Sequence, residues 1–60
     1  MLNIIGKSEA EATEEILNIN MKVRIFKRNG LKLDPFARDI NFNRINLEVI
    51  NGIVTRAFTG

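Results

Sequence analysis

Carboxylates and cations make up most of the side chains in this sequence that could do chemistry. The 60 residues include no Cys and no His, so the usual general base near neutral pH and the commonest metal ligands are missing. Seven acidic residues remain, and four of them crowd one helical segment: Glu9, Glu11, Glu14 and Glu15. Such a group on one helix is typical of a solvated face. We therefore expect a protein with no catalytic site, no metal and no cofactor.

Basic side chains crowd the stretch that follows. They are Lys22, Arg24, Lys27, Arg28 and Lys32, in a chain whose net charge is only +2. Two interpretations fit this pattern: two oppositely charged surfaces on one domain, or a nucleic-acid-binding patch. The chain has no Tyr and no Trp and no recognisable nucleic-acid-binding motif. Nucleic acid is therefore the less favoured partner.

The length of the chain predicts a single domain spanning residues 1–60. A domain of this size buries only about 60% of the surface that its unfolded chain exposes. It has little room for both a core and an enclosed pocket of about 300 Å³ or more. Its apolar runs are far shorter than the roughly 20 residues that a membrane span needs. We expect a cytoplasmic protein with no membrane contact, and a mature secreted form fits the sequence as well.

The start of a helix is marked by Ser8-Glu9-Ala10-Glu11, which has the pattern of a capping box. The Ser8 hydroxyl can accept from the Glu11 amide, and the Glu11 side chain can reach back to the Ser8 amide. Apolar residues then recur at helical spacing at Ala12, Ile16 and Ile19, with Leu17 beside them. The pattern predicts a helix from about Glu9 to Asn18.

Three segments alternate between apolar and polar residues, as strands do: Met21–Phe26, Asn43–Ile50 and Ile53–Phe58. Asn51-Gly52 between the last two predicts a hairpin with a two-residue type I′ loop. Asn29-Gly30 is a further turn signal. The stretch from 27 to 42 otherwise has no clean period, so a long connection is expected there.

The hairpin loop sets a register for the last two strands. It pairs Ile50 with Ile53, Val49 with Val54 and Ile45 with Phe58. The same register sets Arg56 opposite Leu47 on the core face. Either Arg56 reaches out at the edge of the sheet, or a bulge shifts the register.

These elements predict an α+β fold. A single helix packs on a small mixed sheet with a C-terminal β-hairpin, and a long exposed loop joins the two long strands. The first strand can lie parallel to the second only if that loop crosses over or follows the edge. As an edge strand, Met21–Phe26 could pair with a second copy to form a homodimer. The expected core is Ile5, Ala12, Ile16, Ile19, Val23, Ile25, Ile45, Leu47, Val49 and Val54.

Several stretches form a pattern seen in a known family. They are Gly6–Ala12 at the helix start, Val23–Ile25 in the first strand, and Asn43–Val49 with Asn51–Thr55 and Gly60 at the hairpin. Together they resemble the potato inhibitor I family of eglin-like serine-protease inhibitors, most closely its short bacterial and phage branch. The resemblance covers most of the chain and is weakest in the long loop. It implies a protein of a bacterium or a phage-infected host.

The resemblance implies a protease-binding loop at about 31–42, between the two long strands. Counting back from Asn43-Arg44, the resemblance implies a reactive bond between Arg38 and Asp39, in a loop of Pro35, Phe36, Ala37, Arg38, Asp39 and Ile40. An arginine before the bond implies a trypsin-like serine protease as the partner. Arg44 and Asn46 occupy the positions from which the family supports its loop, and Arg44 is expected to hold Asp39.

The sequence departs from the family pattern at three places. Ala37 stands where a threonine is common, Asn46 where a second basic residue is common, and 27–36 is longer than the usual approach to the loop. Each change reduces the preorganisation on which tight inhibition depends. Two alternatives stay open: a docking protein that binds a non-protease host enzyme through the same scaffold, and a nucleic-acid binder using the basic stretch.

Overall fold

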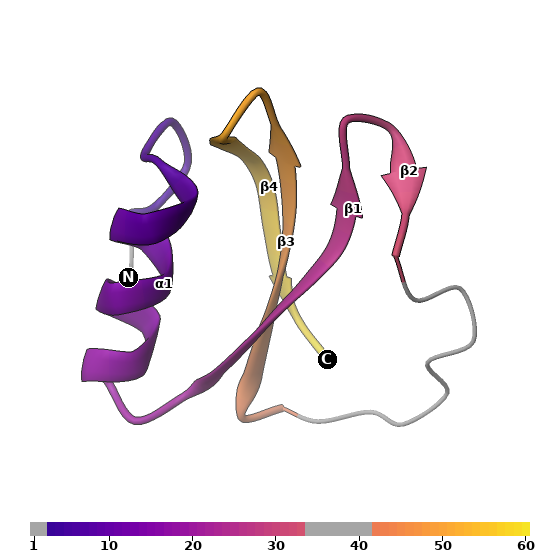
Figure 1. Ribbon diagram of the computed structural model, residues 1–60. Helices are drawn as coiled ribbons and strands as arrows, with labels where there is room; N and C mark the ends of the chain where they lie inside the picture. Colours follow the sequence, from indigo (N-terminus) through magenta and orange to yellow (C-terminus); the bar gives the residue numbers. More distant parts are fainter. Residues whose placement is uncertain (1–2, 34–41) are drawn as a thin grey trace.

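One helix lies over one side of a four-stranded sheet in the computed structural model, which describes residues 3–33 and 42–60 (Figure 1). The elements are α1 (Glu9–Asn18), β1 (Lys22–Arg28), β2 (Leu31–Lys32), β3 (Arg44–Ile50) and β4 (Ile53–Thr59). The structure confirms the predicted α+β fold, with a helix on a mixed sheet and a C-terminal hairpin.

Helix α1 begins at the predicted cap and has the predicted bounds. The Glu11 amide donates to the Ser8 hydroxyl oxygen over 3.2 Å, which satisfies one of the free N–H groups of the first turn. The second half of the capping box differs from the prediction. The Glu11 carboxylate accepts from the Ser8 hydroxyl, at 3.1 Å, instead of from the Ser8 amide.

The strand order is β2-β1-β3-β4. β1 is parallel to β3, while β1–β2 and β3–β4 are antiparallel pairs. The short strand β2 follows the turn at Asn29-Gly30, and the sequence pattern did not predict it as a strand. β1 therefore does not end the sheet, although β2 pairs only with its Lys27 and Arg28. Dimer formation along Met21–Phe26 stays a prediction for the N-terminal part of that strand.

A bulge in β4 resolves the conflict over Arg56. The pairs Ile50–Ile53 and Val49–Val54 are confirmed, after which the register shifts between Glu48 and Val49. Thr55 is the extra residue of the bulge, so Leu47 lies opposite Ala57 and Ile45 opposite Thr59. The predicted pairing of Ile45 with Phe58 is wrong for this reason. Arg56 lies opposite Glu48 and leaves the core face.

The core lies between α1 and the sheet. Its buried residues are Ile4, Ala12, Ile16, Ile45, Leu47, Val49 and Val54, with Met21, Val23, Ile25 and Ala57 packed against them. Two predicted core residues are wrong: Ile5 is 53% exposed and Ile19 is 49% exposed. Ile4 is buried in place of its neighbour Ile5, and Ile19 follows the last helical residue, so the helical stripe does not extend to it.

The hairpin turn gives a first testable prediction. Asn51 and Gly52 have φ values of 52° and 79°, as a type I′ turn requires. Valine is β-branched and is strained at positive φ, so Gly52→Val should lower the free energy of unfolding by about 1–3 kcal/mol. Urea denaturation measures this loss. Thr59→Val, which introduces the same side chain into a strand, should have a midpoint near that of the wild type. Equal midpoints for the two variants would contradict the assigned turn.

Candidate functional site

The structure describes the two predicted support residues, while the predicted reactive loop lies outside the described residues. Pro35, Phe36, Ala37, Arg38, Asp39 and Ile40 lie outside the described residues. The predicted pairing of Arg44 with Asp39 therefore stays a prediction. Arg44 and Asn46 are described, and both belong to β3, the strand to which the long connection returns. The described part of the candidate site is therefore the start of β3, the strand that follows the loop.

Arg44, the first residue of β3, is hydrogen-bonded to Gly60, which follows the end of β4. Its side chain is bound at the end of β4, where Nε and Nη2 donate to the Gly60 carbonyl oxygen over 3.1 and 2.9 Å. The Gly60 amide donates back to the Arg44 carbonyl oxygen over 3.3 Å. Arg44 is only 9% exposed. The guanidinium is thus fixed by several bonds to one residue, and the end of the β3–β4 pair is fixed with it.

Asn46 is the centre of a buried polar network across three strands. Its Nδ2 donates to the carbonyl oxygens of Phe58, at 3.3 Å, and Gly60, at 2.7 Å. Its Oδ1 accepts from Arg24 Nε of β1 over 3.1 Å. The Asn46 side chain is 1% exposed, so its amide lies out of contact with water. Buried amides of this kind stabilise a structure only when their donors and acceptors are paired, as they are here.

The parallel register explains why sequence reasoning missed part of this network. Arg24 lies opposite Asn46 in the β1–β3 pair, although the two residues are far apart in the chain. The sequence predicted Arg44 and Asn46 as support residues through the family resemblance. It had no signal for Arg24, because a lone arginine on an alternating strand is most often solvated. The described structure brings Arg24, Arg44, Asn46 and Gly60 together.

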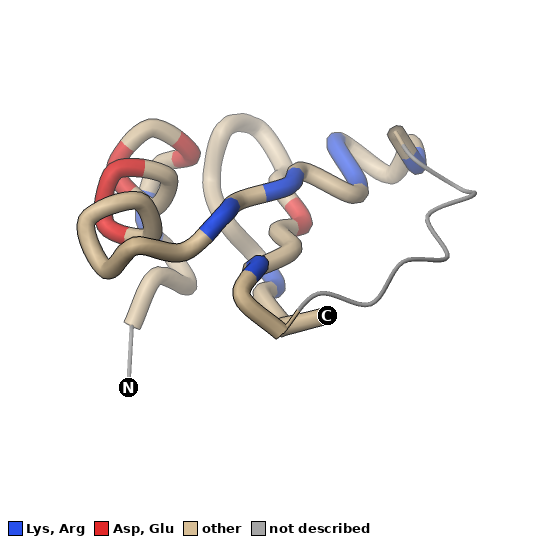
Figure 2. Tube along the Cα trace, turned by 90° about the horizontal axis from the view of Figure 1, so that it is seen from below, with Lys and Arg blue, Asp and Glu red and all other residues tan. Residues whose placement is uncertain are grey.

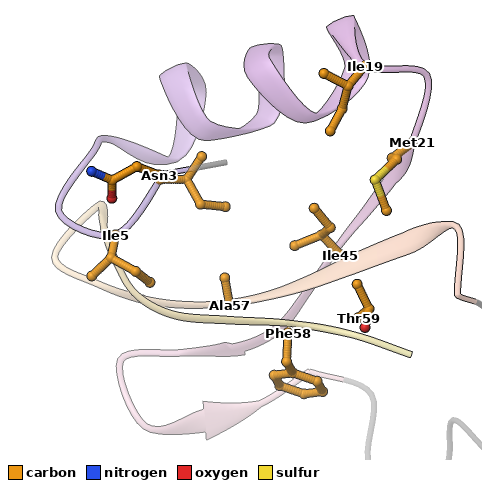
Figure 3. A pocket seen from close by; sticks show the side chains of 9 residues that line it. Asn3, Ile5, Ile19, Met21, Ile45, Ala57, Phe58 and Thr59 are labelled. Carbon is orange, nitrogen blue, oxygen red and sulfur yellow. The ribbon is translucent and has the colours of Figure 1, made fainter. Parts of the chain in front are cut away.

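The sheet face opposite the helix carries two aromatic rings. Phe26 and Phe58 meet edge to face, with centroids 5.0 Å apart and planes at 68°. The Arg56 guanidinium carbon lies 5.4 Å from the centroid of Phe58, within the range of a cation–π interaction. Figure 3 shows the Phe58 ring on the side of the sheet away from the helix. These residues form an apolar and cationic cluster on the face that α1 does not cover.

An open apolar hollow lies on the helix side, between the end of α1, the N-terminal segment and β3–β4 (Figure 3). Its volume is about 700 Å³, and Ile5, Ile19 and Met21 are among its lining residues. The sequence did not lead us to expect a hollow of this size. Among the described residues, none of the side chains that line it is titratable.

No three acidic residues converge into a metal-binding group within 3–33 and 42–60. The described part of the chain also contains no helix of the length and apolarity that crossing a membrane requires. Comparisons of the chain with protein-family models, with curated proteins and with solved structures found no match.

Proposed function

We propose that this chain is a small binding protein that acts like a serine-protease inhibitor. It presents the loop at about 31–42 to a trypsin-like protease, with Arg38-Asp39 as the reactive bond. The proposal rests on the resemblance of the sequence to the potato inhibitor I family. One structural observation supports it: the connection between the adjacent parallel strands β1 and β3 contains this segment, whose residues 31–32 form β2, and β3 is fixed near its start by Arg44 and Asn46.

A loop that binds a protease is either a substrate or an inhibitor. Fixing the strand that follows the loop favours inhibition. Arg38 enters the specificity pocket, where an acidic residue of the protease receives the guanidinium, and the Arg38–Asp39 bond lies at the catalytic serine. If the ends of the cut bond stay in position, resynthesis competes with release. The network of Arg44, Asn46 and Gly60 keeps β3, and with it the C-terminal end of the loop, from moving away. Preorganisation of this kind strengthens binding by reducing the entropy lost on association.

Trypsin assays test the proposal. Wild type at micromolar concentration should slow the hydrolysis of a small trypsin substrate. Arg38→Leu should lose this effect and gain inhibition of chymotrypsin- or subtilisin-like enzymes, because the residue in the specificity pocket sets discrimination. Arg44→Ala should be cut faster after Arg38, which mass spectrometry of the products detects. Arg28→Ala, a matched loss of an arginine on a side chain that is 46% exposed, should behave as wild type does.

A wild-type chain that neither slows trypsin nor is cut at Arg38 would overturn the protease proposal. The favoured function would then be binding of the same scaffold to a host enzyme that is not a protease. Circular dichroism of Arg44→Ala should match that of the wild type, which separates a freed loop from an unfolded domain.

A further inference from the structure

The two layers of the domain carry opposite charge. The acidic residues of the helix lie on one side of the molecule, and most of the basic residues follow the strands (Figure 2). On the sheet face away from α1, the described cations are Lys22, Arg24, Lys27, Lys32, Arg44 and Arg56, and the described carboxylate is Glu48. Lys27 Nζ lies 3.6 Å from Glu48, so one charge of this face is neutralised within it. Of the described cations, Lys22, Lys32 and Arg56 are exposed, and they give this face a positive surface.

The strand pattern explains this separation. Val23 and Ile25 of β1 pack against the core, so Lys22 and Arg24 point to the other side of the sheet. In β4 the bulge turns Arg56 and Phe58 to that same side, since Ala57 packs against the core. Without the bulge, Arg56 and Phe58 would both lie on the helix side, so the face would lose a cation and one ring of its aromatic pair. The bulge thus creates this combination of charge and ring.

We propose that this sheet face binds single-stranded nucleic acid. Phosphates would lie against the exposed side chains of Lys22, Lys32 and Arg56, while an unpaired base packs against the exposed part of Phe58, which is 42% exposed. Proteins that bind single strands without sequence preference combine these two features, a positive track for the backbone and aromatic side chains for the bases.

Single strands fit this face better than a duplex does. The rings can stack only on bases that are unpaired and splayed out. The described part of the face is strand surface, without a helix that would enter a major groove. An acidic polypeptide could also satisfy the cations, but it offers no flat rings for Phe58 and Phe26. The charge favours a polyanion, and the aromatic pair favours one that carries bases.

This inference does not depend on the protease proposal, because none of its residues lies in the loop. Fluorescence anisotropy with a labelled oligothymidine of about 12 nucleotides measures the affinity of the intact chain at two salt concentrations. We expect a Kd of about 1–100 µM that weakens as salt rises. A duplex of the same length should bind more weakly. Unlabelled oligothymidine should displace the probe at a lower concentration than polyglutamate of equal charge.

Four variants assign the contacts. Phe58→Leu keeps an apolar side chain but removes the ring, and it should weaken binding about 5- to 150-fold, whereas Phe58→Tyr should retain it. Arg56→Gln should reduce the salt dependence by about one phosphate contact. Arg28→Gln removes an equal charge from a side chain bound to Glu9 of the helix, at 2.7 Å, and should leave affinity almost unchanged.

Several results would overturn the inference. They are no binding by the wild type, equal competition by polyglutamate, equal affinity for the duplex, or a folded Phe58→Leu variant that binds as the wild type does. Because the first three use the unmodified chain, the test holds even if Phe58→Leu fails to fold.

Discussion

Leu47→Ala should remove a large part of the protein's free energy of unfolding. Leu47 is completely buried in the central strand β3, between Ile25 of β1 and Ala57 of β4. Replacing a buried leucine with alanine removes its transfer free energy and leaves a cavity, at a cost of about 2–5 kcal/mol. A domain of this length has a free energy of unfolding of roughly 3–9 kcal/mol. The loss is therefore comparable with the whole stability.

Urea denaturation followed by circular dichroism measures the effect. The midpoint should fall steeply, or the folded baseline should disappear altogether. Leu17→Ala is the matched control, because Leu17 is 56% exposed on the outer side of α1 and should shift stability by less than about 0.5 kcal/mol. Similar midpoints for the two variants would contradict the assignment of Leu47 to the core.

Asn46→Leu should have the second largest effect, although it replaces a polar side chain with an apolar one inside the protein. Among the described residues, no buried side-chain nitrogen or oxygen lacks a partner. The substitution removes the bonds of Asn46 to Arg24, Phe58 and Gly60. Gly60 keeps its bonds from Arg44, while each other buried group that loses a bond costs about 1–3 kcal/mol, more when it is charged. We expect a loss of about 2–4 kcal/mol in the free energy of unfolding.

The control for Asn46→Leu is Asn18→Leu, the same change at an exposed residue at the end of α1. Its free energy of unfolding should stay within about 0.5 kcal/mol of the wild-type value. Trypsin digestion adds an independent readout, since loosening the end of β4 should speed cleavage after Arg56. A variant Asn46→Leu as stable as the wild type would mean that burial of leucine offsets the whole network.

The helix and the hairpin could be predicted because short-range signals specify both. Ser8 caps the helix within one turn, and Asn51-Gly52 defines the turn between its two flanking strands. Strand β2 was missed because two residues carry no measurable alternation. The sequence did not decide whether β4 contains a bulge at Thr55. Only the packing of Ala57 and Arg56 on opposite faces distinguishes the two registers.

The candidate site was less accessible to sequence reasoning. Arg44 and Asn46 were named through a family resemblance, and their bonds run to Gly60 and Arg24. Both partners depend on long-range pairing: the antiparallel end of β4 and the parallel register of β1. Periodicity describes one strand at a time, so it does not report which side chains meet across strands. The positive face with its two rings was missed for the same reason.

The order of strands has a consequence for synthesis of the chain on the ribosome. β3 lies between β1 and β4 and pairs with both, and the side chains at its start bind Gly60. Until β3 emerges, α1 and β1 have no central strand on which to pack. Their apolar residues stay open to chaperones and proteases during that time. Cooperative folding waits until β4 has emerged, so the time between synthesis of β1 and of β4 sets how long these residues stay exposed.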